Sequence, residues 1–353
     1  MNSLREVKTQ MHFASDNNSG ALPEIMQAMN DCNRGHVPSY GEDEFTKLAN
    51  AEMQKAFGKC DIYYMFNGTA ANVVALKSLL QPYEAVICSD VSHLQNDECG
   101  APEANIGCKL LLCETTDGKL SPQSIEEKLL RLGDTHHVQA KVISITQPTE
   151  YGTTYTLEEL QKLRDFAKAK NLYLHMDGSR LPNATIHLNC DLKEVVAGFD
   201  IISLGGTKNG LAGAEAILSF LPEKKDHLRY LRKQSMQLAG KMRFVSSQFY
   251  AWLVNDLWQD TARHVCGLAQ ELAAKLADLP EVEITQKVQS NAVFAKMPRE
   301  VIKEVRKKYF FYVWNEKTWE VRLMISFDTK AEDVDGFVQA VKQSLSKHVP
   351  THR

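Results

Sequence analysis

The sequence predicts an α/β protein with a mostly parallel sheet between helices, followed by a smaller α+β region. Short apolar runs alternate with amphipathic helical stretches from about residue 61 to residue 220, an order typical of parallel strands joined by crossover helices. Beyond about residue 240 this alternation stops, and strand-like and helical segments follow in a different order. The length of 353 residues is sufficient for a large domain with a smaller partner.

In the first region, the apolar runs are short enough to be buried strands, and the stretches between them have helical spacing. One of the helices begins with Thr156 and Glu159, a capping-box pattern. Such helices are expected to cover both faces of the sheet. The predicted strands are residues 62–66, 85–88, 109–113, 141–146, 172–176, 200–204 and 216–220, and the predicted helices are residues 70–80, 121–132 and 156–170.

The last third of the chain is predicted to form an α+β module with antiparallel strands. It begins with a long helix, continuous or broken, over residues 244–279. We place the boundary near residue 240, giving a large domain of residues 11–240, a small domain of residues 241–353 and an N-terminal arm of residues 1–10. The other predicted elements are strands at 282–286, 292–296 and 320–327, and helices at 300–309 and 331–345.

Composition and charge argue against several classes of protein. The net charge is −3 and no long block of one sign occurs, so we expect neither a nucleic-acid partner nor a membrane-surface role. The polar first ten residues lack a signal-peptide core, and no stretch is long enough to span a membrane. The eight cysteines form no C-x-x-C pair and are expected to be reduced. These features predict a cytoplasmic protein.

A turn between a strand-like run and a helix is a candidate anion site. Gly68 and Thr69 stand at the predicted helix start, in the sequence FNGTAAN of residues 66–72. Backbone N–H groups and a hydroxyl at such a position can bind a phosphate. The alternative is an ordinary helix cap, which this segment alone favours. It is not a Walker loop, which ends in Gly-Lys-Ser/Thr.

Two further strands end in charged residues. Asp177 ends one apolar run, where open α/β sheets bind ligands, and Arg180 follows it. Asp177 could pair with a protonated ring nitrogen and Arg180 with a carboxylate, or the two could form a simple turn pair. Lys208 follows the next strand among small residues. A buried lysine there becomes nucleophilic toward carbonyls, whereas an exposed Gly-rich turn would carry it incidentally.

His93 follows the strand at residues 85–88, with Glu98 close behind. Its ring could stack on a flat cofactor or move protons, although a structural histidine is the commoner case. No third ligand is spaced to make a metal site with His93 and Glu98, and we predict none.

The order of these segments resembles the low-specificity L-threonine aldolases, which are β-eliminating lyases of the pyridoxal phosphate (PLP) fold-type I group. The resemblance covers nearly the whole chain and implies a seven-stranded-type sheet in the large domain. Its motifs are S-D-N at residues 15–17, Y-G-E-D at 40–43, N-G-T-A-A-N at 67–72, H-x-x-x-x-E-x-G from 93, H-x-D-G-x-R from 175, the lysine segment, and G-K-M-R at 240–243.

This resemblance implies a role for each matching residue. Lys208 would hold PLP as a Schiff base, Asp177 would pair with the pyridine nitrogen, and His93 would stack on the ring. The family forms dimers or tetramers with active sites between subunits, and a homotetramer is expected. The remaining implied contacts are Gly68, Thr69 and Asn72 to the phosphate, Ser15, Arg180 and Arg322 to the substrate carboxylate, and Tyr40 and Arg243 to the cofactor and substrate, from a neighbouring subunit.

The resemblance implies retro-aldol cleavage of a β-hydroxy-α-amino acid such as L-threonine or L-allo-threonine into glycine and an aldehyde. The chain departs from the family at Glu150, where many members have the histidine of E-N-T-H, and at Asn67, where serine is usual. Glu150, His93 or a water molecule is therefore the expected base. The alternatives are a phenylserine aldolase, another PLP-dependent β-eliminating lyase or aminotransferase, and an inactive relative that acts as a binding protein.

Overall fold

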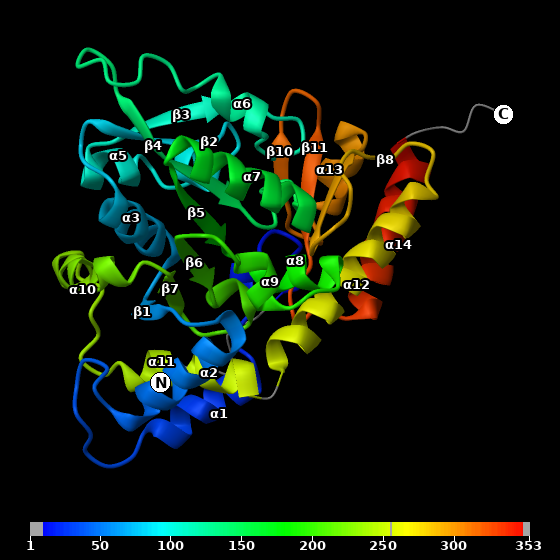
Figure 1. The fold of residues 1–353 in the computed structure, drawn as a ribbon. Coiled ribbons are helices and arrows are strands. Elements are labelled where there is room, and N and C mark those ends of the chain that lie inside the picture. Colours follow the sequence, from blue (N-terminus) through cyan, green and yellow to red (C-terminus); the bar gives the residue numbers. More distant parts are fainter. Residues whose placement is uncertain (1–9, 255, 349–353) are drawn as a thin grey trace.

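The computed structural model describes residues 10–254 and 256–348. This part of the chain contains a seven-stranded sheet in the order β1-β7-β6-β5-β4-β2-β3, in which β7 alone runs antiparallel (Figure 1). The predicted mostly parallel α/β class is therefore confirmed. The strands are β1 (Asp61–Met65), β2 (Glu84–Ser89), β3 (Lys109–Cys113), β4 (Gln139–Thr146), β5 (Tyr173–Gly178), β6 (Ile201–Gly205) and β7 (Glu215–Ser219).

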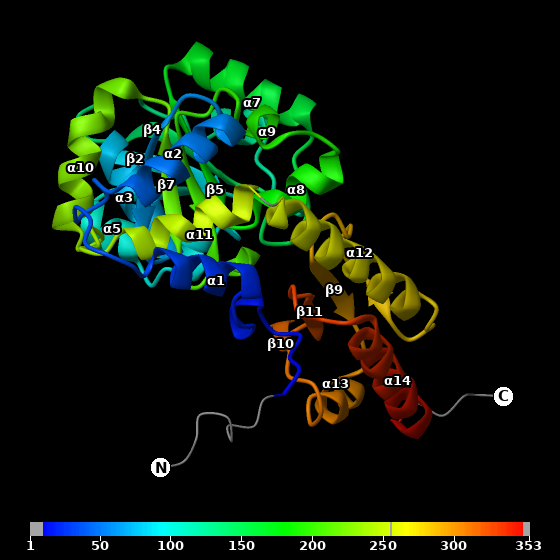
Figure 2. The ribbon, with the colours of Figure 1, turned by 90° about the horizontal axis from the view of Figure 1, so that it is seen from below.

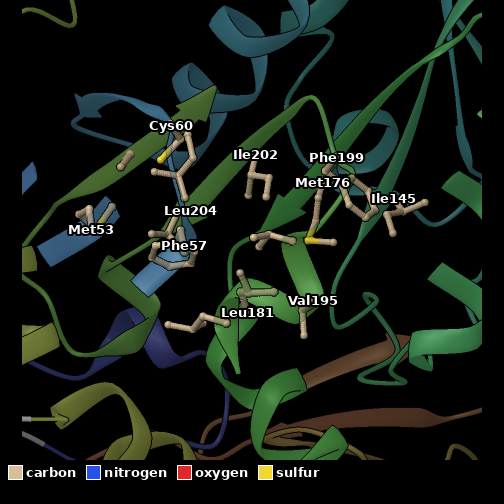
Figure 3. Packing of buried hydrophobic residues seen from close by; sticks show 14 of the residues in the cluster. Met53, Phe57, Cys60, Ile145, Met176, Leu181, Val195, Phe199, Ile202 and Leu204 are labelled. Carbon is tan, nitrogen blue, oxygen red and sulfur yellow. The ribbon is translucent and has the colours of Figure 1, made fainter. Parts of the chain in front are cut away.

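Helices cover both faces of this sheet because its strands are apolar on both sides. In β6, Ile201 packs into the cluster under α3, α5 and α10, whereas Ile202 and Leu204 pack on the opposite side. Figure 3 shows that opposite side, where Phe57 of α2 and Val195 of α9 meet the sheet. These helices are α2 (Glu44–Phe57), α3 (Gly68–Leu79), α5 (Ala101–Ile106), α7 (Leu157–Lys170), α8 (Leu181–Leu188), α9 (Leu192–Val196) and α10 (Lys225–Gln234).

Two of the predicted helices show how local signals succeed and fail. The capping box of α7 is confirmed, since the Thr156 hydroxyl accepts from the Glu159 N–H and the Glu159 carboxylate accepts from the Thr156 N–H. The helix predicted over residues 121–132 is wrong in length, because α6 spans only Pro122–Glu126. Leu130 and Leu132 are exposed, so no buried face favours a longer helix.

The C-terminal region forms a four-stranded antiparallel sheet in the order β10-β11-β9-β8. The long helical stretch is broken into α11 and α12, which lie along one side of the molecule in Figure 2. Strand β10 was not predicted. The elements are α11 (Arg243–Val254), α12 (Leu257–Ala277), β8 (Glu283–Ile284), β9 (Ala292–Lys296), α13 (Arg299–Val305), β10 (Tyr312–Asn315), β11 (Glu320–Met324) and α14 (Ala331–His348).

The packing of the cores bears on the proposed division into residues 11–240 and 241–353. Phe249 and Trp252 of α11 pack with the large sheet, and α11 lies against α1 (Pro23–Cys32) and α2. Phe13 instead packs with the C-terminal core, and its backbone bonds to Phe310 and Met324. The division stays a proposal, in which α11 and the segment around Phe13 each pack with the other unit.

This topology brings several loops to one edge of the large sheet. Strands β1, β2, β4, β5 and β6 all run in one direction, so their carboxyl ends meet at the same edge. Strand β7 runs the opposite way and begins there. In doubly wound sheets the carboxyl edge is where ligands bind.

Candidate active site

Lys208 lies in a 3₁₀ turn, Thr207–Asn209, directly after β6. The turn is tightly packed: a Cβ added at Gly205 would collide with the Ser179 backbone. The Asn209 amide also donates to the carbonyls of Ser179 and Gly205, at 3.0 and 2.8 Å. Burial and the nearby Arg180 lower the pKa of Lys208, which favours the neutral, nucleophilic amine.

Asp177 ends β5 and is buried. One carboxylate oxygen accepts from the N–H and hydroxyl of Ser179 at 2.9 and 2.5 Å, and the other accepts from the Asn72 amide at 2.9 Å. Burial opposes ionisation, but the charges of His93 and Lys208 and these hydrogen bonds outweigh it and lower the pKa of Asp177. Asp177 is therefore a fixed negative charge at the floor of the site.

His93 begins the short helix α4 (His93–Asn96) and is held by two acidic side chains. Its ring Nδ1 lies 2.9 Å from Glu98, and its backbone N–H donates to Glu150 at 2.9 Å. Glu98 also accepts from Asn72 at 2.8 Å. Because Asn72 bonds to both Glu98 and Asp177, one buried network links α3, β5 and the segment between α4 and α5.

Glu150 lies in a tight turn after β4. Gly152 has φ +74°, and a Cβ on it would crowd Ser290, so the turn requires glycine. Glu150 Oε1 accepts from Thr146 and from the His93 N–H, whereas Oε2 is buried without a hydrogen-bond partner among the described residues. Burial raises the pKa of Glu150 to about 7, against the hydrogen bonds from Thr146 and His93.

Arg180 forms a two-fold hydrogen-bonded pair with the buried Asp16. Its Nε and Nη2 donate to the two carboxylate oxygens at 2.6 and 2.9 Å, and Asn291 adds a bond to Asp16 at 3.2 Å. This geometry is the strong form of an arginine–carboxylate pair. Asp16 therefore occupies the guanidinium edge that a substrate carboxylate would otherwise bind in this way.

Arg322 on β11 lies beside this pair and has a vacant donor. Its Nε is buried and has no hydrogen-bond partner in the described part of the chain, and its Nη2 donates to the Ala14 carbonyl at 3.4 Å. The rings of Trp314 and Tyr312 lie 4.9 and 5.8 Å from the guanidinium carbon. Burial and then Arg180 lower the pKa of Arg322 to about 10. The negative charge of a bound anion would offset both effects on the guanidinium group. Ser15, next to Ala14, accepts from the Asn17 N–H at 3.2 Å.

Gly68 and Thr69 form the first turn of α3, immediately after β1. The Asn67 side chain caps this helix by accepting from the Ala70 N–H at 2.8 Å. Asn67 thus supplies the capping oxygen at the position where serine is usual in the resembling family. The free N–H groups at the start of α3 lie at the carboxyl edge of the sheet, where an anion can bind.

Tyr40 and Arg243 are not joined to this cluster within one chain. Tyr40 is half exposed, with φ 60°, and its N–H bonds to the Gly240 carbonyl. Arg243 donates to the carbonyls of Arg34 and Gly35 at 3.0 and 3.4 Å. The structure thus brings together Ser15, Asn72, His93, Glu150, Asp177, Arg180, Lys208 and Arg322 at the sheet edge, with Gly68 and Thr69 in the adjoining turn.

Three acidic residues that lie at this edge were given no role by the sequence analysis: Asp16, Glu98 and Glu215. Asp16 and Glu98 lie within the quoted motifs, which is the signal that could have found them. Glu215 begins β7 and accepts from the Gly206 N–H at 2.9 Å. Its partner is nine residues away across a turn, and no pattern of spacing predicts that contact.

Comparisons with known proteins show the family to which the chain belongs. The model of the beta-eliminating lyase family matches residues 12–299. A low specificity L-threonine aldolase of a Pseudomonas species is 40% identical over 95% of this chain and 98% of its own. Another, of Pseudomonas aeruginosa, is 41% identical over 91% of this chain and 94% of its own. The solved threonine aldolase of Leishmania major is 28% identical, with TM-score 0.89, and the match covers 94% of this chain and 99% of that one.

Proposed function

Because the chain belongs to the β-eliminating lyase family, we propose that it is a PLP-dependent aldolase that cleaves β-hydroxy-α-amino acids of the L-threonine type into glycine and an aldehyde. The resemblance seen in its motifs is confirmed by relatives of 40 and 41% identity over most of the chain. The observation that carries the proposal is the placement of Lys208, Asp177 and His93 around one carboxyl edge of the sheet.

The side chains at this edge fit PLP. The start of α3, with Gly68 and Thr69, suits the phosphate, and Asp177 suits a protonated pyridine nitrogen. The buried Asn72 Oδ1 has no partner among the described residues, so it can accept a hydrogen bond from a ligand. When bound, PLP supplies an electron sink for the pair of electrons released from the Cα–Cβ bond.

The protein groups orient the substrate and move its protons. We assign the substrate carboxylate to Arg322 first, because its buried Nε is vacant, with Arg180 and Ser15 beside it. Holding the carboxylate fixes which bond at Cα lies perpendicular to the ring, and this choice separates aldol cleavage from transamination. His93, held by Glu98 and Glu150, suits stacking on the ring.

The proposal is tested by incubating the purified protein with L-threonine and measuring acetaldehyde and glycine, with and without added PLP. We expect equimolar products that depend on PLP. If the protein binds PLP but releases no acetaldehyde from L-threonine, DL-phenylserine is offered next. Release of benzaldehyde would then support the phenylserine alternative. Ammonia and a keto acid in place of glycine would contradict aldol cleavage, and failure to bind PLP would favour an inactive binding protein.

We propose that Glu150 is the base that removes the proton from the substrate β-hydroxyl. Its Oε2 is buried and unpartnered, and its raised pKa of about 7 makes it a better proton acceptor than an ordinary carboxylate. Because the carboxylate form is the base, activity should fall as the pH drops through about 7. Many members of the resembling family have a histidine at this position, and the ordinary pKa of histidine, about 6.5, is close to the pKa of about 7 of Glu150.

Replacement of Glu150 by glutamine is expected to lower kcat by roughly 10²- to 10⁴-fold, the range for general-base catalysis. The acidic limb of the pH–rate profile near pH 7 should disappear, and the threo/erythro preference should change. Steady-state assays with L-threonine and L-allo-threonine at several pH values measure the pH–rate profile and the threo/erythro preference. Glu158→Gln, at an exposed position of α7, is the control. An unchanged rate and diastereomer ratio in Glu150→Gln would remove Glu150 from this role.

We propose a homodimer or homotetramer with active sites between subunits, working in the cytoplasm. One observation that supports the assembly is an apolar groove of about 620 Å³ between α1, α2 and α11. The other is that Tyr40 and Arg243 are not joined to the site of their own chain. The lining of this groove includes Ala28, Phe45 and Leu48. Analytical ultracentrifugation measures the assembly.

All eight cysteines are unpaired, as in reducing compartments, and no described helix is both long and apolar enough to cross a membrane.

A further inference from the structure

Glu215 is a buried carboxyl group that the proposed chemistry leaves without a role. It is the first residue of β7 and is 6% exposed. In the sheet it lies opposite Gly205 of β6 on one side and Met65 of β1 on the other. It therefore sits between the strand that leads to Lys208 and the strand that leads to the Gly68 turn. A carboxyl group is costly to bury at such a position unless its partners compensate.

The partners of Glu215 belong to the turn that carries Lys208. Its Oε2 accepts from the Gly206 N–H at 2.9 Å, and Gly206 leads directly into the turn Thr207–Asn209. Gly206 has no room for a side chain, since an added Cβ would collide with the Ala214 carbonyl. The turn is thus fixed by sterics on one side and by the Glu215 carboxylate on the other.

Three carboxylates raise the pKa of Lys208, in the order Asp16, Asp177 and Glu215, and the first two are bonded to other charged or polar groups of the site. The charged groups that act on Lys208 are Arg180, Asp16, Asp177 and Glu215. Asp16 is paired with Arg180, and Asp177 accepts from Ser179 and Asn72 and faces His93. The strand neighbours of Glu215 carry no charge, and α3, which packs on β7, has Lys77 only in its last turn.

We propose that Glu215 is a positioning residue for Lys208: its carboxylate holds the turn through the Gly206 N–H, and this bond places a negative charge two residues before Lys208. The proposal rests on the proposed function in so far as Lys208 is the residue that bears the cofactor. Burial raises the pKa of Glu215 to about 7, opposed by Thr207, Gly206 and Lys208. The charge is therefore present above about pH 7 and is lost below it.

The test compares Glu215→Gln, which keeps an oxygen to accept from Gly206 but removes the charge, with Asn209→Ala, which loosens the same turn without changing charge. In the holoenzyme, the absorbance band of lysine-bound PLP is titrated with pH. In the cofactor-free protein, acetylation of Lys208 by acetic anhydride is followed against pH by peptide mass spectrometry. In both measurements we expect the Glu215→Gln midpoint to fall by about one pH unit, the size expected for one nearby charge.

The Asn209→Ala midpoint should stay at the wild-type value in both measurements. Identical midpoints in Glu215→Gln and wild type would overturn the inference while leaving the proposed function intact. An equal shift in Asn209→Ala would also overturn it, because turn geometry rather than charge would then control Lys208. If the protein binds no PLP, the proposed function fails, and the acetylation midpoints still decide whether Glu215 sets the proton affinity of Lys208.

Discussion

Replacement of Lys208 by alanine is expected to lower aldolase activity by at least about 10³-fold, the scale on which enzymes lose rate when a covalent nucleophile is removed. We propose the Lys208 amine, which directly follows β6, as the nucleophile, and burial and Arg180 lower its pKa, which favours the neutral form. Alanine cannot form the covalent link, so PLP would be held only by contacts with its phosphate and ring. Acetaldehyde release from L-threonine measures the activity, and borohydride reduction followed by mass spectrometry measures the link.

The matched control is Lys109→Ala, which removes an exposed lysine of β3. It should keep wild-type activity and wild-type labelling by borohydride. If Lys208→Ala retained more than a tenth of the wild-type rate, or if reduction attached PLP to another lysine, the assignment of Lys208 would be wrong.

Replacement of Asp177 by asparagine is expected to lower kcat by roughly 10²- to 10³-fold, which is typical for loss of one preorganised electrostatic contact. The carboxylate stays ionised because its lowered pKa reflects the charges of His93 and Lys208 and its hydrogen bonds. Asparagine keeps an oxygen for Ser179 but cannot stabilise a protonated ring nitrogen. Substrate binding, which relies on the arginines, should change much less, so kcat should fall more than KM rises.

A structural loss is separated from an electrostatic one by two further variants. Asp200→Asn alters an acid that directly precedes β6, accepts from the Leu174 N–H at 2.7 Å and lies outside the site, and it should keep full activity. Asp177→Glu restores the charge and should recover part of the rate. Equal losses in Asp177→Asn and Asp177→Glu, with unchanged thermal unfolding, would show that charge is not what Asp177 contributes.

The sequence predicted the large sheet well because its signals are local. Each buried parallel strand is a continuous apolar run, and the capping box at Thr156 marks the start of its helix. The helix after Ser121 was predicted too long because Leu130 and Leu132 are exposed, and exposure is not visible in the sequence. Strand β10 was missed because its Trp314 packs on Tyr151, in the turn after β4, and on Phe294 of β9, a non-local stabilisation.

The candidate site could be predicted only as far as its residues follow strand ends or known motifs. Asp177 and Lys208 were proposed in this way, and both lie at the carboxyl edge of the sheet. The pairing of Arg180 with Asp16 could not be foreseen, because 164 residues separate the two in the chain. In the proposed function, this pairing is the reason for assigning the substrate carboxylate to Arg322.

The attachment of Phe13 to the C-terminal strands has a consequence for biosynthesis. The residues that follow Phe13 supply Ser15 and Asp16, and Phe13 is anchored by the backbone of Phe310 and Met324. A nascent chain on the ribosome therefore carries its first site residues long before the strand that anchors them has been made. Contacts of such long sequence separation form late, so this enzyme should gain activity only once translation is nearly finished.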